Sequence, residues 1–514
     1  MDLGTAPLPG KSSEPLRTHR AGGTRAELAF PLHVDRAARE PLHRQIAAQF
    51  RAAITHGTLP PGALLPGSRA LAATVRVARG VIVEAYAELH AEGYLETRHG
   101  AGTRVTPTLP HAGPRASPAP RAARWLRPER DAPSVHAPAT PGVIDFRLGQ
   151  PSVKELDRDA WRRAWREATR HAPPDDYGDP AGDPALRAAL AEYVTRSRGL
   201  PTTLDGVLVT TGVVQALDLI ARAVLRPGDT VAFENPGYRL ARQVLREHGA
   251  RLLPVPVDGD GLRVQDLPEG EDAPLLLYCT PSHQYPLGSR LSVARRLALL
   301  EWARRNDVLI LEDDYDSEFR FDASPLPTLR SLAEDDRVAY LGTLSKVLTP
   351  AVRLGYVIAP RLLTGRLIRE KSLADWHTPH PVQIALAHFV RGGHLERHVR
   401  RMRRVYARKR HVLSVALGVL APHARLTGID AGLHACLELP AHVNAASVAA
   451  ACDARGVRVG TLDTYFDASA SVPPDRSALL LGYGALTVEE IQAGAAVIVS
   501  AVRAATAPRG TAPS

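Results

Sequence analysis

A lysine in the segment LGTLSKVLTPAVRLGY, residues 341–356, is notable because lysine is rare in this chain. Of the 64 basic residues among 514, only five are lysine, at positions 11, 154, 346, 371 and 409. Arginine can replace lysine wherever a positive charge suffices, but only a primary amine can lose its proton and attack a carbonyl carbon. Lys346 is therefore a candidate nucleophile, although a surface lysine left by chance is the simpler alternative.

Acidic residues cluster in EDDYDSEF, residues 312–319, directly after the apolar run VLIL. A solvated loop would be rich in acidic residues. The acids follow an apolar run and precede Lys346 by about one strand and one helix, which favours a shared site.

Short apolar runs alternate with helical patterns through the second part of the chain. Such alternation predicts an α/β domain with a mostly parallel sheet, buried on both faces. Polar or small residues end each run, and ligands in open α/β sheets bind beyond the carboxyl ends of the strands. We therefore expect these strand ends to meet at one site. Lys346 follows directly after one of them. The runs are GVLVTTG, TVAFENPGY, PLLLYCTPSHQYP, DVLILEDDYDSEF and RVAYLGTLSK.

A smaller module precedes this domain, at residues 36–105, where nine arginines stand against five glutamates. The spacing of its apolar residues predicts a first helix whose core stripe is Leu42, Ile46, Phe50 and Ile54. Two short helices should follow, at about 68–74 and 79–92, and then a two-stranded wing across residues 99–102. Helix, turn, helix and wing is a layout that reads DNA, although a small helical packing module is the alternative.

Composition sets the remaining boundaries. Residues 1–35 are rich in Pro, Gly, Ser and Thr and are expected to form a flexible tail, and the proline-rich residues 106–141 to form a linker. The large domain then spans 142–505. We expect no secretory signal, membrane span or metal site, since no apolar run is long enough and the three cysteines lack ligand spacing. A cytoplasmic protein is the simplest expectation, and the net charge of +10 suggests a polyanionic partner.

The run ERHVRRMRRVYARKR, residues 396–410, could be a second nucleic-acid patch. Val399, Met402 and Tyr406 recur at helical spacing within it, which favours an amphipathic helix whose arginines face solvent.

The module at 36–105 resembles the winged-helix domain of GntR-type transcription regulators, through LLPGSRALA, VARGVIVEAYAEL, AEGYLE and GAGTRV. It departs from that pattern at Arg76 and Ala78, where the family has Gly and Ser, and at Gly80 and Val81, where the family favours Asn and Thr. The resemblance implies that double-stranded operator DNA contacts Ser68, Arg69, Arg79, Gly80, Arg98, His99 and Arg104.

The large domain resembles fold-type I pyridoxal-phosphate enzymes, and more closely the MocR subfamily of GntR regulators, through ENPGY, TPSHQYPLG, EDDYDSEFRF and GTLSKVLTPAVRLGY. The resemblance implies that Lys346 holds pyridoxal 5'-phosphate as an imine and that Asp313 contacts the pyridine nitrogen. It further implies that Tyr315 donates to the ring hydroxyl oxygen and that Tyr238 stacks on the ring. Phosphate donors would be Gly212, Val213, Thr343, Ser345 and Arg353, with His283 on the pocket wall.

Aminotransferases of this superfamily usually hold the substrate carboxylate with an arginine in a late strand. In ALLLGYG, residues 478–484, that position is Leu480, while Arg476 lies outside the apolar run. We therefore predict a dimeric regulator that senses an amino compound or B6 vitamer with little turnover. The rivals are an active aminotransferase with a fused DNA-binding domain, and a DNA-binding protein whose large domain is only a scaffold.

Overall fold

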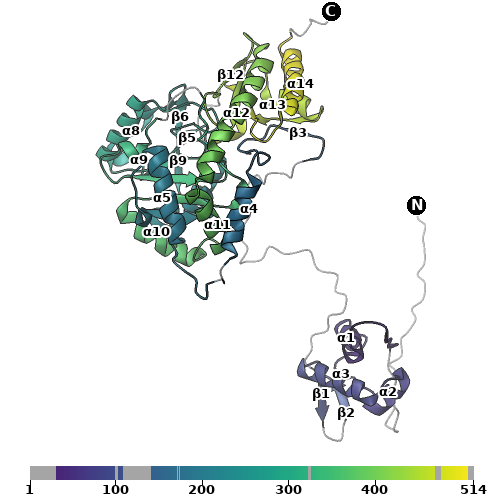
Figure 1. The fold of residues 1–514 in the computed structure, drawn as a ribbon. Helices are drawn as coiled ribbons and strands as arrows, with labels where there is room; N and C mark the ends of the chain where they lie inside the picture. Colours follow the sequence, from purple (N-terminus) through teal and green to yellow (C-terminus); the bar gives the residue numbers. More distant parts are fainter. Residues whose placement is uncertain are drawn as a thin grey trace, which may run out of the picture. The chain divides into compact units, whose positions relative to one another are not determined.

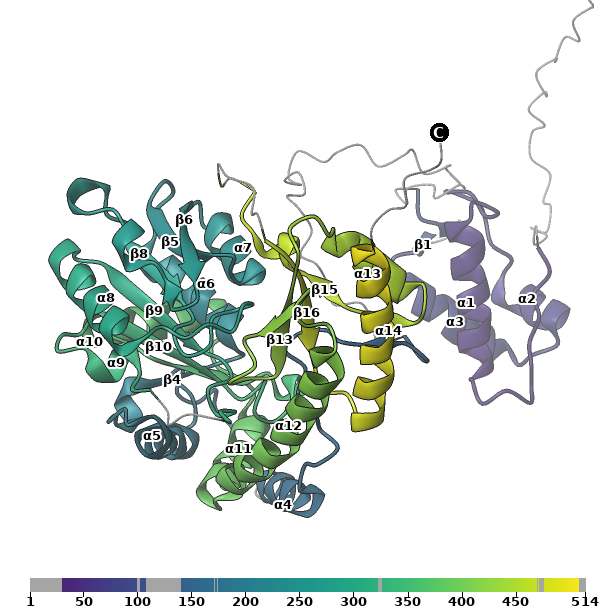
Figure 2. The ribbon, with the colours of Figure 1, turned by 90° about the horizontal axis from the view of Figure 1, so that it is seen from above.

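The computed structural model describes residues 30–98, 102–107, 140–170, 172, 174–321, 326–468, 470 and 476–507. These residues belong to two compact units, one within residues 1–130 and the other within 131–514. Figure 1 and Figure 2 show the elements of each unit from two directions. No helix among the described residues is long and apolar enough to cross a membrane.

The N-terminal unit contains three helices and a hairpin, in the order α1 (Leu42–Thr55), α2 (Ser68–Val75), α3 (Arg79–Ala91), β1 (Leu95–Arg98) and β2 (Gly102–Val105). The two strands pair antiparallel as the wing, with Leu95 opposite Val105. One face of each helix closes a common apolar core. Its members include Ile46, Phe50, Leu71, Ile82, Ala85 and Leu89. The predicted bounds of α2 and α3 are therefore correct to within one residue at each end, and the predicted core stripe of α1 includes the buried Ile46, Phe50 and Ile54.

Residues 30–35 correct the predicted tail, because they pack on α1. The Phe30 ring meets the Phe50 ring edge to face, with centroids 5.7 Å apart. The His33 amide donates to Gln49 Oε1, and the Asp35 amide donates to Gln45 Oε1, each over 2.9 Å. An aromatic side chain and two glutamine side chains thus fix a segment whose composition suggested a flexible chain. The rest of the predicted tail lies outside the described residues, as does the predicted linker between residues 108 and 139.

The turn between α2 and α3 carries two of the four departures from the family pattern, Arg76 and Ala78. Arg76 ends α2 in the left-handed region, with a φ of 55°, where glycine would be unstrained. Its carbonyl oxygen accepts a hydrogen bond from the Arg36 guanidinium over 2.5 Å. Ala78 is the N-cap of α3 and provides no side-chain hydrogen bond. The turn therefore lacks glycine at its left-handed position 76 and lacks a side-chain N-cap at position 78.

An eight-stranded sheet forms the centre of the large unit. Strands β10, β9, β8, β5 and β6 run parallel to one another, whereas β11 is antiparallel to both its neighbours and β7 is antiparallel to β6. All five predicted apolar runs are strands of this sheet. Its order is β4 (Val207–Thr210), β11 (Gly355–Ile358), β10 (Val338–Thr343), β9 (Leu309–Asp314), β8 (Leu276–Cys279), β5 (Thr230–Asn235), β6 (Arg251–Asp258) and β7 (Gly261–Leu262).

Helices cover both faces of this sheet, which explains why its strands are apolar on both sides. Alternate strand residues such as Leu276 and Tyr278 pack with α6 (Val213–Val224), α7 (Arg239–Glu247) and α10 (Arg361–Ala374). Leu277 and Cys279 pack on the opposite face with α8 (Val293–Asn306). The remaining helices on that face are α4 (Arg158–Ala168), α5 (Pro184–Arg198), α9 (Leu329–Leu332) and α11 (His380–Arg391).

The last part of the chain forms a smaller layer, in which helices α12 (His394–Gly418), α13 (Ala445–Asp453) and α14 (Val488–Thr506) pack beside an antiparallel sheet (Figure 2). That sheet has the order β12 (Arg425–Thr427), β13 (His434–Leu439), β16 (Ser477–Gly482) and β15 (Gly460–Thr461). Strands β3 (Ile144–Asp145) and β14 (Val457–Arg458) pair beside it.

Helix α12 contains the arginine-rich run. Its apolar residues Val399, Met402 and Tyr406 are buried, so the predicted amphipathic helix is confirmed. Several of its arginines are exposed, but Arg403 donates to the Glu318 carbonyl oxygen over 2.6 Å, so part of the charge is structural.

Candidate functional site

Lys346 lies in the turn after β10, at the carboxyl end of the central sheet. Its Nζ donates a hydrogen bond to the Gly149 carbonyl oxygen over 2.8 Å. Burial lowers the pKa of this amine, the charges of Asp316 and Asp313 oppose that shift, and Arg353 adds to it. A lowered pKa increases the neutral, nucleophilic fraction of the amine at neutral pH.

Gly149 is a site residue that the sequence analysis missed. Its φ is +72°, and a Cβ at this position would lie 2.7 Å from Lys346 Nζ. Any other residue would therefore be strained and would push the amine away. The two residues are 197 positions apart in the chain, so no local pattern could have revealed the contact.

Asp313, near the end of β9, has two oxygen atoms in different situations. Its Oδ2 accepts a hydrogen bond from the Tyr278 hydroxyl over 2.5 Å. Its Oδ1 is buried, and no group of the described residues donates a hydrogen bond to it. Burial raises the pKa of this carboxyl to about 7, against the opposing influences of Tyr278 and Lys346. A buried oxygen without a donor fits a ligand that brings one, such as a protonated ring nitrogen.

Groups that could donate hydrogen bonds to an anion lie around the turn between β4 and α6. Gly212, the N-cap of α6, has a φ of +125°, and a Cβ there would lie 3.2 Å from the Arg353 guanidinium. Thr343 and Ser345 follow β10, and the Ser345 amide donates to Thr343 Oγ1 over 3.1 Å. No carboxylate among the described residues forms an ion pair with Arg353. A helix N-terminus beginning at Val213, beside hydroxyls and an arginine, suits a phosphate group.

Three tyrosines form an aromatic wall. Tyr238, the N-cap of α7, meets the Tyr285 ring edge to face at 5.6 Å between centroids. Tyr285 meets Tyr465 at 5.5 Å in the same manner. Burial, and next the charge of Asp313, raises the pKa of Tyr238 to about 12, which is consistent with a place near that carboxyl. Tyr285 and Tyr465 were not predicted.

Tyr315 contacts a buried cluster of polar residues. Its hydroxyl lies 3.0 Å from His283 Nδ1, which also lies 3.0 Å from Asp316 Oδ2. The His283 and His434 rings are 4.8 Å apart between centroids. Ligand atoms of His283, Asp316 and His434 all lie within 4.8 Å of one another, a spacing that could hold a metal ion. The same atoms already take part in hydrogen bonds, and the absence of a metal site stays a prediction.

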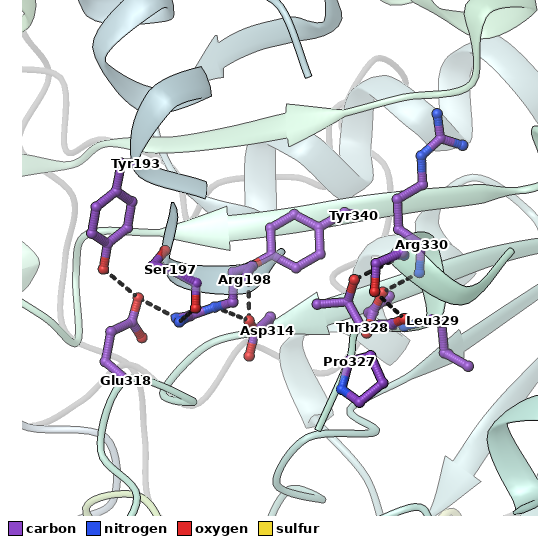
Figure 3. A network of polar contacts seen from close by, with 12 residues as sticks. Tyr193, Ser197, Arg198, Asp314, Glu318, Pro327, Thr328, Leu329, Arg330 and Tyr340 are labelled. Carbon is purple, nitrogen blue, oxygen red and sulfur yellow. Dashed lines mark hydrogen bonds and ion pairs between the residues drawn. The ribbon is translucent and has the colours of Figure 1, made fainter. Parts of the chain in front are cut away.

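The acidic run divides between two environments, and only part of it belongs to the pocket. Asp314 and Glu318 bind the buried Arg198, at 2.8 and 2.5 Å (Figure 3). The Tyr340 hydroxyl donates to Asp314 over 2.7 Å, and the Tyr193 hydroxyl donates to Glu318 over 3.1 Å. These acids hold α5 against the sheet. Asp313 and Asp316 remain as the acids near Lys346.

Leu480, which stands where aminotransferases usually place a carboxylate-binding arginine, has a fully buried side chain in β16. It belongs to an apolar cluster with Leu148 and Leu287, against which Tyr285 packs. Arg476 is exposed. The position is therefore apolar, as the sequence suggested.

Most of the predicted DNA-binding residues lie on the surface of the N-terminal unit. Arg69, Arg79, Gly80 and Arg104 are exposed. The Arg79 guanidinium donates to the half-buried Ser68 Oγ over 3.3 Å, which links the starts of α2 and α3. Arg98 ends β1, and His99 lies outside the described residues.

Comparison with known proteins identifies the same two units. Residues 42–105 match the family of bacterial regulatory proteins of the gntR type, and residues 141–459 match aminotransferase class I and II. The probable rhizopine catabolism regulatory protein MocR of Rhizobium meliloti is 34% identical over 93% of this chain and 100% of its own length. The chain belongs to the MocR-type regulators of the GntR family.

Other MocR-type relatives agree. The pyridoxine biosynthesis transcriptional regulator PdxR of Corynebacterium glutamicum is 35% identical over 82% of this chain and 88% of its own. Among solved structures, kynurenine aminotransferase of Pyrococcus horikoshii covers 72% of this chain and 93% of its own, with 25% identity and a TM-score of 0.66. LysN, the α-aminoadipate aminotransferase of Thermus thermophilus, covers 71% and 94%, with 28% identity and a TM-score of 0.64.

These comparisons confirm the resemblance, the fold class and the regulator function predicted from the sequence. This MocR-type chain is a transcription regulator with a GntR-type DNA-binding domain and an aminotransferase-like domain, which favours regulation over the rival of a fused aminotransferase.

Proposed function

We propose that this MocR-type regulator binds pyridoxal 5'-phosphate at Lys346 and uses the loaded pocket to sense an amino compound or a B6 vitamer. The observation that carries this proposal is the buried Oδ1 of Asp313, for which the described residues provide no hydrogen-bond donor. A protonated pyridine nitrogen would satisfy it. When bound, the cofactor supplies an aldehyde and an electron-withdrawing ring.

Each part of the cofactor has a matching group in this chain. Lys346 would bind the aldehyde carbon, and Asp313 would hold the ring nitrogen in its protonated form. Tyr238 would lie against the ring, and Tyr315 would donate to the ring hydroxyl oxygen. The amides of Gly212 and Val213, with Thr343, Ser345 and Arg353, would bind the phosphate, and His283 would orient Tyr315 through their 3.0 Å contact.

The compounds bound to the two structural neighbours support this choice. Kynurenine aminotransferase was solved in complex with PMP, and LysN was solved with N-(5'-phosphopyridoxyl)-L-leucine. Both compounds are derived from vitamin B6.

Borohydride reduction followed by peptide mapping tests the attachment. We expect the purified protein with added pyridoxal phosphate to absorb in the visible range and, after reduction, to carry the cofactor on Lys346. The Lys346→Ala variant should carry none, and Lys154→Ala, which removes an exposed lysine, should behave as the wild type. Cofactor on another lysine, or none at all, contradicts the proposal, and the second result favours the scaffold rival.

Sensing without rapid turnover is the second part of the proposal. Since Leu480 cannot grip a carboxylate, an α-amino acid would be poorly oriented for proton transfer. Rapid mixing of the loaded protein with a panel of amino acids should release little keto acid. Release at about 1 per second or faster, an ordinary enzyme rate, would instead support an active aminotransferase.

The DNA-binding part of the proposal is a homodimer that presents two winged helices to two half-sites of an operator, in the cytoplasm where the chromosome lies. Arg79→Ala should lower specific affinity by ~1–3 kcal/mol if Arg79 reads guanine. Arg104→Ala should weaken binding to all sequences and reduce the dependence on salt. Anisotropy titrations at several salt concentrations check both, and a chain starting near Pro141 that still binds the operator would contradict the assignment.

A further inference from the structure

The recognition helix α3 presents an apolar surface on the side away from its own core. Val83 is 46% exposed, in contrast to Ile82, Ala85 and Leu89, which are buried. Gly80 and Ala87 are also exposed, at the spacing that places helical residues on one face. The exposed face that begins with Arg79 is therefore apolar at its centre.

Gly80 leaves this face open to close approach. A Cβ built at Gly80 would meet no atom within 4 Å, so nothing in the described unit covers the start of the helix. The Arg79 guanidinium is oriented by its 3.3 Å hydrogen bond to Ser68. An open helix start with a fixed arginine can come close to base edges.

The acidic residues of α3 are bound to α1. Glu84 lies 3.3 Å from His43 Nδ1. Glu88 and Glu92 both pair with Arg51, at 3.3 and 2.7 Å. Arg51 thus holds Glu88 and Glu92 toward α1, which lowers the negative charge around Val83, although Glu84 keeps 67% of its side chain exposed.

Thymine is the base whose chemistry fits this face. Among the base edges in the major groove, only thymine offers a methyl group, and small apolar side chains contact it, whereas arginine binds guanine. Val83 lies one helical turn after Arg79, about 6 Å along the helix axis. This distance spans roughly two base-pair steps of B-form DNA.

We infer that Val83 reads the methyl group of a thymine within about two base pairs of a guanine read by Arg79. The inference rests on the proposed DNA-binding function and adds the base that the helix centre selects. Val83 is thus a specificity-determining residue, and an apolar contact defines this operator position.

The test uses the full-length protein and duplexes selected by it from a random library, with and without pyridoxal phosphate. Each selected thymine is then replaced singly by deoxyuridine, which removes only the methyl group. The wild type should lose about fourfold in affinity at one thymine of each half-site, the equivalent of one buried methyl group.

Val83→Ala should lose a similar factor on the thymine duplex and should respond to the same deoxyuridine by less than about twofold. The control Val415→Ala removes an exposed valine of α12, where Val415 is 62% exposed, and should respond as the wild type does. The inference is overturned if the wild type binds every deoxyuridine duplex as tightly as the thymine duplex. It is also overturned if Val83→Ala loses as much affinity as the wild type when thymine is replaced by deoxyuridine, because the loss would then come from the DNA and not from Val83. If the protein selects no sequence at all, the proposed DNA-reading function fails as well.

Discussion

The proposed role of Asp313 predicts different behaviour of this carboxyl in the free and the cofactor-loaded protein. Its carboxyl is buried, with one oxygen bound by Tyr278 and the other without a donor in the described chain. Burial raises its pKa to about 7, so near neutral pH far more of this carboxyl is protonated than in an exposed aspartate. A cationic ring nitrogen would reverse this shift by stabilising the carboxylate.

We therefore predict opposite effects of Asp313→Asn in the free and loaded protein. Between about pH 4 and pH 7 the folded carboxyl holds a proton that the unfolded one has lost, so wild-type stability falls as pH rises through this window. Asparagine does not titrate. The cofactor-free variant should be more stable than the wild type at pH 8, by on the order of 4 kcal/mol, and this advantage should fall to about 1–2 kcal/mol at pH 5.

Urea unfolding at pH 5 and pH 8 measures this difference. Asp260→Asn, at a carboxyl with 73% of its side chain exposed, is the control and should show no such pH dependence. Pyridoxal phosphate should bind Asp313→Asn more weakly than the wild type. A variant that has the same stability relative to the wild type at both pH values would show that Asp313 is not buried as a neutral acid.

Sequence alone suggests a site residue where the chemistry can use only one type of side chain. Lys346 and Asp313 could be proposed from the sequence because an imine requires a primary amine and a protonated ring nitrogen requires a carboxylate beside it. Gly149 and Tyr278 could not, since they contact Lys346 and Asp313 only through the fold, from 197 and 35 positions away. The acidic run was also misleading in part, because Asp314 and Glu318 bind Arg198 away from the pocket.

At the scale of elements, the buried Lys371 of α10 supports the turn between β4 and α6 through a chain of hydrogen bonds. Gln215 accepts from the Thr211 amide over 2.9 Å and donates to Asp375 over 2.7 Å. Lys371, fully buried in α10, donates to the same Asp375 over 2.5 Å. This chain of contacts fixes the turn that carries Gly212.

Lys371→Ala should therefore weaken cofactor binding although Lys371 does not face the pocket. Loss of a buried charged hydrogen bond costs ~1–3 kcal/mol, part of which would appear as a lower affinity for pyridoxal phosphate, about tenfold. Spectroscopic titration measures that affinity, and mapping after reduction should still find the cofactor on Lys346. Unchanged affinity would mean that the α10 contact does not support the phosphate turn.

The turn between α2 and α3 offers the opposite case, a position where the sequence is suboptimal. Arg76 adopts a φ of 55°, which costs an L-residue about 1 kcal/mol relative to glycine. Arg76→Gly should stabilise the N-terminal unit by about that amount. Amide hydrogen exchange measures this change and should be slower in α2 and α3 of the variant. Faster exchange would indicate that the Arg76 side chain contributes more than the strain costs.

Apolar periodicity predicted the elements well. The five apolar runs became strands because each is buried on both faces, and the helices of the N-terminal unit match because their core stripes are regular. Residues 30–35 were mistaken for tail because their contacts with α1, made by Phe30 and by hydrogen bonds to Gln45 and Gln49, leave no periodic pattern in the sequence. Strand order and the antiparallel β11 depend on contacts between distant segments and were not predictable.

At the scale of the whole molecule, the chain contains a GntR-type DNA-binding domain and an aminotransferase-like domain with the proposed cofactor pocket. A regulator of this design requires coupling between them, since a ligand can shift DNA binding only if it favours one state of the protein. The coupling constant is thus the quantity that distinguishes a sensor from a scaffold.

The most direct test measures the affinity of the full-length protein for its selected operator by fluorescence anisotropy, with and without pyridoxal phosphate, across a panel of amino compounds and B6 vitamers. In the wild type, we predict that at least one of these ligands changes the dissociation constant by fivefold or more, about 1 kcal/mol of coupling. Lys346→Ala should bind the same DNA without any response, and Lys154→Ala should respond as the wild type. Equal DNA affinity in all conditions, or an equal response in Lys346→Ala, would contradict the account.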